Sequence, residues 1–238
     1  DGAAVVSDVL MGSAPTPIMY YKHMAKQTIN LDMAWAADPS CRHVVLIRDP
    51  VKLAASFAAK EDEKVHSETS LDELGVVSLV QVFSKLRTVA AAAGLPPPIV
   101  LDSDDLTRDP EGTLKTLCAA LGIPADDAAM ASMMAWPEGP KDCDGVWASY
   151  WYESVHKSSG WNLAAEKPAG ESSFKTLPKS LFALVEEAMP FYEMLKRHAL
   201  KPEGFESKLP VWTMGLEGDL ARPCTILAKD CVAAVAKM

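Results

Sequence analysis

The segment from His43 to Phe57, HVVLIRDPVKLAASF, constrains the fold more than any other part of this sequence. Its apolar run Val44–Ile47 is typical of a strand buried on both faces, and this strand is predicted to end at Arg48. Asp49 is a favoured helix cap and Pro50 suits the first position of a helix. The segment therefore predicts a strand, a tight turn and a helix in immediate succession.

Arg48 and Ser56 flank the predicted turn, and Ser56 stands eight positions after Arg48. A guanidinium fork matches the oxygens of a phosphate, and a hydroxyl together with amides at the start of a helix adds further donors. The same residues also fit a purely structural turn, in which Arg48 pairs with Asp49 and Ser56 is simply a small helix residue. The local pattern leaves an anion site and a structural turn as alternatives.

Strand and helix signals alternate through the first half of the chain. Strands are predicted at Ile18–Lys22, His43–Ile47 and Ile99–Leu101, and the three-and-four spacing of apolar residues predicts a helix over Leu71–Ala93. Such alternation is typical of an α/β fold in which helices flank a parallel sheet. We therefore expect this fold class.

The second half of the sequence is predicted to be mainly helical. The segment DPEGTLKTLCAALGIP predicts a helix that is capped by Asp109 and stopped by Gly122. Further helices are predicted over Trp147–Lys157, which is rich in aromatic residues, and over Leu177–Leu200, where Pro190 is expected to kink or split the helix. Residues 1–200 are interpreted as one α/β domain, and residues 201–238 as a linker and C-terminal appendage.

The composition narrows the classes of function. A net charge of −9 disfavours binding to nucleic acid, and no apolar run reads as a transmembrane segment, so we expect a soluble protein. The cysteines are scattered, odd in number and without metal-ligand spacing: Cys41, Cys118, Cys143, Cys224 and Cys231. They indicate no metal site and a reducing compartment, either the cytoplasm or an organelle stroma. Because the sequence starts without Met, a targeting segment is not observable.

Three motifs in order resemble the sulfotransferase superfamily. They are RDPVKLAAS, SDDLTRDPEGTLKTLCAALGIP and the stretch from WPEG to HKSSGW. The likeness covers about residues 18–200 and extends to bacterial sulfotransferase-family proteins and to the sulfotransferase-like region of plant branched-chain aminotransferase-like proteins. It implies a P-loop NTPase-like α/β fold that uses 3′-phosphoadenosine 5′-phosphosulfate (PAPS) without a metal. The sulfuryl group would pass to a small hydroxyl or amine acceptor, leaving 3′,5′-adenosine bisphosphate.

The resemblance also assigns candidate site residues. In the family, an arginine and a serine eight positions later bind the 3′-phosphate, which implies this role for Arg48 and Ser56. The HKSSGW segment resembles a loop that closes over the nucleotide, so Lys157 and Ser159 are candidate donors to phosphate, with a solvated helix end as the alternative. His23 is a candidate general base beside Lys22, although it is displaced by one position from the family pattern.

The sequence departs from the family at one important point. No Gly/Ser-rich phosphate loop precedes Ile18, and KPAGESS at Lys167–Ser173 reads as an ordinary loop. Such a loop stabilises charge on the phosphosulfate group during transfer. We therefore weigh two hypotheses: an N-terminally truncated enzyme domain, and a pseudoenzyme that serves as a structural subunit among protein partners.

Two further groups of residues invite a functional interpretation. The acidic pair Asp104 and Asp105 corresponds to a family element that ties the third strand to the next helix through hydrogen bonds to backbone amides, and this structural role is favoured over a metal site. The aromatic residues suit either a core or an acceptor pocket, and a core is favoured: Trp136, Trp147, Tyr150, Trp151, Tyr152 and Trp161.

Overall fold

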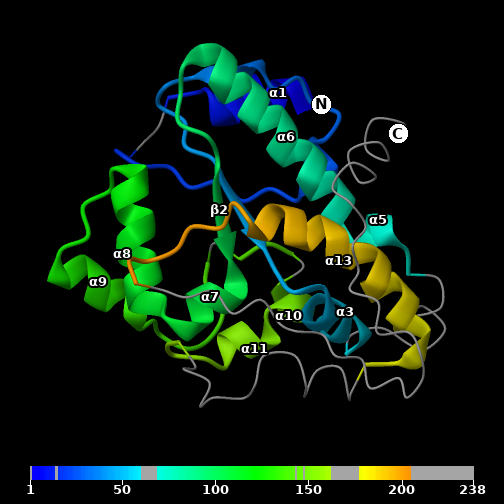
Figure 1. Ribbon diagram of the computed structural model, residues 1–238. Helices are drawn as coiled ribbons and strands as arrows, with labels where there is room; N and C mark the ends of the chain where they lie inside the picture. Colours follow the sequence, from blue (N-terminus) through cyan, green and yellow to red (C-terminus); the bar gives the residue numbers. More distant parts are fainter. Residues whose placement is uncertain are drawn as a thin grey trace. The chain divides into compact units, whose positions relative to one another are not determined.

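Figure 1 shows the computed structural model, which describes residues 2–13, 16–59, 69–142, 144–146, 148–161 and 177–204. The described residues fall into two compact units. The first unit contains residues up to 101 together with 177–199, and the second contains 102–161 together with 200–204. Both units are rich in helices, and the sheet belongs to the first.

Strands β1 (Val44–Ile47) and β2 (Ile99–Asp102) form a small parallel sheet. The amide of Ile99 donates to the carbonyl of His43 over 2.9 Å and joins the beginnings of the two strands. Val100 of β2 also forms a parallel bridge with Ala199. The prediction of strands at these two places and of an α/β class is confirmed.

The strand predicted at Ile18–Lys22 is wrong. This segment has no strand pairing in the structure, and Ile18 and Tyr20 are 58% and 84% exposed. A short apolar run becomes a strand only when it finds a partner edge and a covered face. Among the described residues this run has neither.

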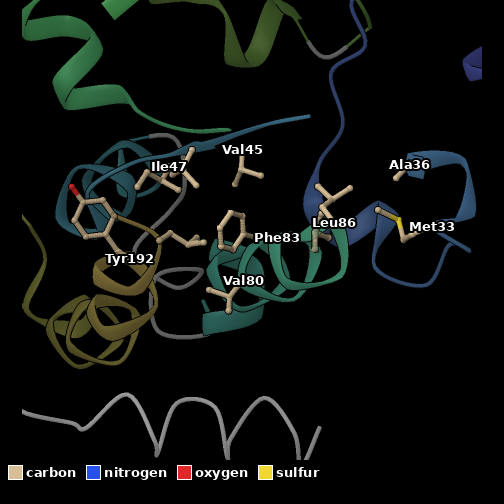
Figure 2. Close-up of a cluster of buried hydrophobic side chains, with 11 residues drawn as sticks. Met33, Ala36, Val45, Ile47, Val80, Phe83, Leu86 and Tyr192 are labelled. Atoms are coloured by element: carbon tan, nitrogen blue, oxygen red, sulfur yellow. The ribbon is translucent and has the colours of Figure 1, made fainter. Parts of the chain in front are cut away.

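The two faces of β1 differ, although the sequence predicted burial of both. Val45 and Ile47 are 4% and 2% exposed, whereas Val44 and Leu46 are 40% and 57% exposed. Figure 2 shows the buried pair in a cluster with Phe83 of α6. The prediction of two buried faces is therefore wrong, because only one face of β1 packs against this cluster.

The helical segment predicted over Leu71–Ala93 is divided at Gly75. There α5 (Leu71–Leu74) ends and α6 (Val76–Ala93) begins, and Gly75 has a φ of 71°, which favours glycine. The first of these helices starts with a capping box between Ser70 and Glu73. The predicted apolar face of the longer helix is buried: Val76, Val80, Phe83, Leu86 and Ala90.

Helix α6 is the one helix in the described ranges that is long and apolar enough to cross a membrane, with a mean hydropathy of 1.4 over 18 residues. Its residues Val80, Phe83 and Leu86 belong to the buried cluster of the first unit. Length and composition of this kind are shared by helices at the core of globular domains. The packing explains why the helix is so apolar.

Helix α13 (Phe182–Lys196) contains Pro190 in its interior and continues through it. Of the two predicted effects of this proline, a kink or a split, the split is not found. Ala188 and Tyr192, on either side of Pro190, are both buried, and α13 contacts α6 and α3 (Pro50–Ala58). Packing of the helix on both sides of the proline compensates for the hydrogen bond that Pro190 cannot make.

The remaining elements are short or moderate in length. The first unit also contains α1 (Gly2–Ala4), the π-helical η1 (Val5–Leu10), α2 (Ala25–Thr28), and the 3-10 helices η2 (Ala34–Ala37) and η3 (Lys179–Leu181). The second unit contains α7 (Ser103–Arg108), α8 (Pro110–Leu121), α9 (Asp127–Met134), α10 (Ala148–Trp151) and α11 (Glu153–His156).

Helix α8 follows the sequence prediction closely. The Oδ1 atom of Asp109 accepts from the amide of Gly112 over 2.9 Å, and Gly122 closes the helix with a φ of 70°. The aromatic-rich helix predicted over Trp147–Lys157 is instead two short helices, α10 and α11, which are separated at Tyr152.

Several predictions fall on residues that the structure does not describe. These residues include Lys167–Ser173 and most of the predicted appendage 201–238, with Cys224 and Cys231 in it. Cys143 and Trp147 also lie outside the described residues. The domain boundary at residue 200 stays a prediction.

Candidate functional site

The turn between β1 and α3 is built around the side chain of Asp49. This residue is fully buried, and its Oδ1 atom accepts hydrogen bonds from the amides of Val51 at 2.8 Å and Lys52 at 3.4 Å. Pro50 occupies the first position of the helix and has no amide hydrogen. The predicted cap and turn are thus formed.

This capping corrects one part of the predicted anion site. The amide of Leu53 donates to the carbonyl of Asp49 over 2.9 Å, so the amides of the first turn of α3 all have internal acceptors. The sequence interpretation had these amides available to a phosphate. An anion at this turn must instead be held by side chains.

Arg48 and Ser56 are both exposed. Neither side chain makes a hydrogen bond or an ion pair with another part of the chain that the structure describes. The alternative in which Arg48 pairs with Asp49 is therefore not found. Ser56 lies six residues beyond Pro50, about 9 Å further along the helix axis. Both polar side chains are open to solvent.

The rigidity of this turn comes from the opposite face of α3. Val51 and Ala54 have no exposed surface and pack with Leu181 and Val185 in a second buried cluster of the first unit. Because this face of the helix is fixed in the core, the position of Ser56 relative to the helix start is fixed as well.

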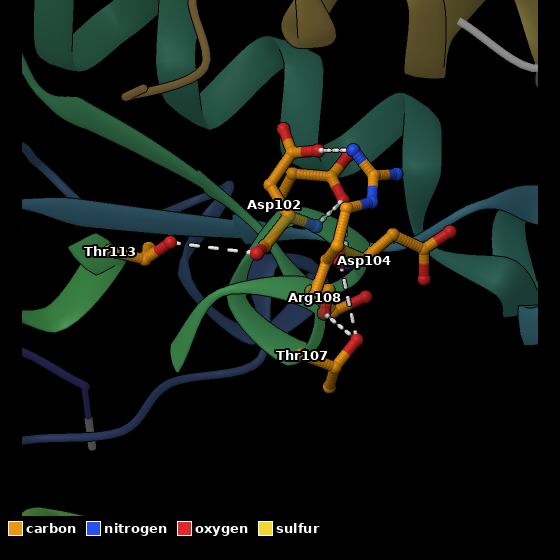
Figure 3. Close-up of polar contacts among 7 residues, drawn as sticks. Asp102, Asp104, Thr107, Arg108 and Thr113 are labelled. Atoms are coloured by element: carbon orange, nitrogen blue, oxygen red, sulfur yellow. Dashed lines mark hydrogen bonds and ion pairs between the residues drawn. The ribbon is translucent and has the colours of Figure 1, made fainter. Parts of the chain in front are cut away.

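The turn between β2 and α7 is also capped by a buried aspartate, but here the nearby arginine is paired. Asp102 is fully buried, and its Oδ1 atom accepts from the amides of Asp104 at 2.7 Å and Asp105 at 3.3 Å. Figure 3 shows these polar contacts together with the bond from Thr113 to the carbonyl of Asp105, which is 3.5 Å long. These bonds link residues of α7 to one another and to α8.

The acidic pair Asp104 and Asp105 needs a correction. The amide hydrogen bonds that were predicted for this pair are accepted by Asp102 instead. Asp105 is 1% exposed at its side chain and pairs with Arg108 at 3.5 Å. A cap must stand before the first turn of its helix, which is the place of Asp102. Asp102 is therefore the helix cap, while Asp105 serves the fold through its ion pair with Arg108.

The loop around Lys157 and Ser159 is tied to the segment that follows α9. Trp136 donates from its amide to the carbonyl of Ser159 over 3.1 Å and from Nε1 to Oγ of Ser158, also over 3.1 Å. Gly160 forms an antiparallel bridge with Ala135. The backbone of this loop is therefore well supported within the second unit.

The side chains of Lys157 and Ser159 are exposed, and Lys157 forms an ion pair with Glu153 at 2.7 Å. This pair is one helical turn apart and lies at the surface, where such pairs are weak. Lys157 can therefore leave Glu153 for a stronger anion at little cost.

The aromatic residues of the second unit serve mainly as internal packing. Trp136 and Trp161 meet edge to face with ring centroids 5.6 Å apart, and Nε1 of Trp161 donates to the carbonyl of Met133 over 3.0 Å. Both indole N–H groups are thus satisfied internally. Trp151 is 43% exposed. These contacts fit the predicted packing role of the two tryptophans.

The candidate base His23 and its neighbour Lys22 lie in an exposed segment before α2. The ring of His23 stacks near that of Tyr21, with centroids 6.4 Å apart. In the described ranges no carboxylate or carbonyl orients the imidazole of His23, whereas Nε2 of His156 lies 2.9 Å from Asp144. Sequence reasoning missed this second pair. Its residues stand twelve positions apart and give no periodic signal.

The described part of the chain contains no group of three or more His, Cys, Asp or Glu side chains that would suit a metal ion. Cys41 is half-buried and Cys118 is buried, and both are free thiols. Burial, together with the nearby carboxylate of Asp38, raises the pKa of Cys41. The thiol of Cys41 is therefore not activated as a nucleophile.

Comparison with known proteins identifies the family of this chain. The family model described as a sulfotransferase domain matches residues 2–199. The chain belongs to the sulfotransferase family. The resemblance found in the three sequence motifs is thereby confirmed, and the helix-rich α/β structure with its small parallel sheet is consistent with such a domain.

Two curated plant proteins are similar to this chain in sequence. Branched-chain-amino-acid aminotransferase-like protein 1 of Arabidopsis thaliana is 38% identical over 198 residues, which make up 83% of this chain and 32% of that protein. Branched-chain-amino-acid aminotransferase-like protein 2 of the same plant is 36% identical over the same shares. The chain thus spans about a third of the length of these relatives. No solved structure matches it at a significant level.

Proposed function

We propose that the β1–α3 turn binds the 3′-phosphate of PAPS and of its product, 3′,5′-adenosine bisphosphate, in a sulfotransferase domain. Arg48 would supply the charged, bidentate contact, and the hydroxyl of Ser56 would supply a second donor. Lys157 and Ser159 would add donors from the loop that resembles the nucleotide-closing loop of the family. PAPS itself would supply the activated sulfuryl group for a small hydroxyl or amine acceptor.

One observation carries this proposal. The capped turn fixes the backbone that carries Arg48 and Ser56, yet neither side chain has an internal partner in the described ranges. A guanidinium that serves the fold is normally paired, as Arg108 is with Asp105. An exposed arginine and serine beside a rigid helix start match what a phosphate dianion needs.

The acceptor side of the reaction is less well supported by the geometry. Lys22 and His23 remain candidates for proton transfer, since an imidazole titrates near neutral pH. A general base works best when a neighbouring group orients it, and His23 has no such group in the described ranges. Donor binding is therefore the firmer part of the proposed function.

The second candidate is a non-catalytic, sulfotransferase-derived subunit that acts through protein partners. The exposed position of His23 and the overall charge of −9 favour it, because both weaken the arrangement needed to bind and process an anionic donor. The two candidates differ in a property that is simple to measure, namely affinity for the nucleotide.

Isothermal titration with 3′,5′-adenosine bisphosphate tests the proposal. We expect Arg48→Ala to weaken binding at least tenfold, or roughly 1.4 kcal/mol, the effect of losing a charged phosphate contact. Arg42→Ala is the matched control, because Arg42 is also exposed and its guanidinium already donates to the carbonyls of Pro39 and Cys41. This control should bind like the wild type.

A second ligand identifies which phosphate is recognised. Adenosine 5′-monophosphate lacks the 3′-phosphate, so Arg48→Ala should leave its weaker binding unchanged. An equal loss of affinity for both ligands would show that Arg48 does not contact the 3′-phosphate. No detectable binding of the bisphosphate by the wild-type chain would overturn donor binding and favour the structural subunit.

A further inference from the structure

Asp144 and His156 form a close pair in the second unit. The Nε2 atom of His156 lies 2.9 Å from Oδ2 of Asp144, and the two side chains are 19% and 18% exposed. The amide of Lys141 donates to the same carboxylate oxygen over 2.8 Å. Two donors therefore converge on one partly buried acceptor.

The ionisation of this pair follows from these contacts. The hydrogen bond from the Lys141 amide, with a further contribution from His156, holds the pKa of Asp144 below its usual range. An ionised carboxylate only accepts hydrogen bonds, so Nε2 of His156 must carry the hydrogen between them. The tautomer of His156 is thereby fixed.

The pair lies next to backbone hydrogen bonds that connect the segment before Asp144 with the segment around His156. The amide of Gly139 donates to the carbonyl of His156 over 2.8 Å, and the amide of Trp136 donates to the carbonyl of Ser159 over 3.1 Å. The rings of Tyr152 and His156 are nearly perpendicular, with centroids 6.1 Å apart. His156 is thus held from three directions, immediately before Lys157.

We propose that Asp144 and His156 are a positioning pair that fixes the backbone of Lys157–Ser159 for contact with the nucleotide donor. This inference rests on the proposed function. The side chains that would meet the ligand are exposed, and ordering them on binding reduces affinity. A backbone that is already fixed before binding lowers that loss. His156 acts here through its neighbours and not as a catalytic residue.

Asp144→Ala is the direct test, and Asp142→Ala is its matched control. Asp142 lies in the same turn and carries the same charge, but it is exposed and its side chain makes no hydrogen bond or ion pair with another described residue. Two readouts are needed: hydrogen exchange of the Gly139 amide by NMR, and affinity for 3′,5′-adenosine bisphosphate by titration. The amide of Gly112, at the start of α8, reports whether the second unit stays folded.

In Asp144→Ala, we expect faster exchange at Gly139, unchanged exchange at Gly112 and binding weakened by roughly tenfold. Asp142→Ala should match the wild type within about twofold. His156→Gln places an amide donor near the position of Nε2, so it should retain most of the affinity, whereas His156→Ala should not. The double variant Asp144→Ala/His156→Ala should be no worse than either single alanine variant, because they remove the same interaction.

Three outcomes would overturn the inference. Wild-type exchange at Gly139 in Asp144→Ala would show that the pair does not hold the loop. Faster exchange with unchanged nucleotide affinity would remove the positioning role while leaving the proposed function intact. No nucleotide binding by the wild-type chain would remove the proposed function, and the positioning role with it, whatever the exchange shows.

Discussion

The two strand-to-helix turns of this protein share a cap and differ in what surrounds it. Asp49 and Asp102 are both fully buried, and each accepts hydrogen bonds from two amides of the helix that follows. After β2, the nearby arginine, Arg108, is paired with Asp105 inside the same helix. In the turn after β1, Arg48 stands just before the cap and has no such partner in the described ranges.

This difference separates a fold-forming polar cluster from a binding cluster. A buried aspartate cap is part of folding in both turns, because an unsatisfied helix start inside a protein is costly. A paired arginine adds to that internal network. An unpaired, exposed arginine beside the same cap adds little to folding and is available to a ligand. The comparison predicts opposite responses to mutation at the two turns.

The largest effect should come from removing a buried cap. We expect Asp102→Ala to lower the free energy of unfolding by about 2 to 3 kcal/mol, since two amides lose an acceptor in a buried place. Asp126→Ala is the control. This residue caps α9 at the exposed surface, and its loss should cost about 1 kcal/mol. Urea unfolding measures both. Equal losses would show that burial does not distinguish these caps.

The next effect compares the two arginines directly. Arg108→Ala should lower the free energy of unfolding by about 1 kcal/mol, because it removes the partner of a buried carboxylate while Arg108 itself is 39% exposed and screened by solvent. Arg48→Ala should change it by less than about 0.5 kcal/mol. A loss of stability in Arg48→Ala as large as in Arg108→Ala would make Arg48 a structural residue and end the distinction.

A pH effect is expected from the opposite end of β1. Burial lowers the pKa of His43 from its ordinary 6.5, and Nε2 of His43 lies 3.1 Å from the carbonyl of Ala36. As the pH falls below that ordinary value, the unfolded chain binds a proton that the folded chain resists, so stability decreases towards the folded pKa and then levels off.

Urea unfolding at several pH values between 7.5 and 5 tests this expectation by measuring how the free energy of unfolding depends on pH. His43→Gln should show a shallower fall in stability than the wild type. His198, whose pKa is also lowered by burial, contributes in the same direction in both proteins. Identical slopes would mean that the half-buried His43 does not govern the dependence of stability on pH.

The smallest effect on stability should come from Ser56→Ala. The side chain of Ser56 is exposed and makes no hydrogen bond within the described residues, so the free energy of unfolding should change by less than about 0.5 kcal/mol. Ser84→Ala, at an exposed position of α6, is the matched control. The two variants should differ only in affinity for 3′,5′-adenosine bisphosphate. A larger loss of stability for Ser56→Ala would show that this serine has a structural role.

Local signals explain what the sequence predicted well. The strand at β1, the cap at Asp49 and both ends of α8 depend on neighbours within a few residues, and all three are found in the structure. Predictions of this kind hold because the hydrogen-bonding groups of caps and turns find their partners within a few residues. They also located Arg48 at the end of a strand, which is the basis of the candidate site.

Tertiary contacts explain what the sequence could not predict. The exposure of Val44 and Leu46 depends on which face of the sheet is packed, and the failure of the Ile18–Lys22 strand depends on the lack of a partner strand among the described residues. The sequence predicts Asp49 as a cap, but only the folded turn shows that this cap occupies the first amides of α3. The Asp144–His156 pair needs the folded loop before its members meet.

The closed first turn of α3 also has an evolutionary consequence. Because Asp49 satisfies the helix start without help from any ligand, the fold of this turn does not depend on Arg48 or Ser56. A lineage can therefore gain or lose the phosphate contact by single substitutions at the surface, without passing through an unstable intermediate. Descendants of one sulfotransferase ancestor can then diverge into nucleotide-binding and purely structural forms that retain the same core.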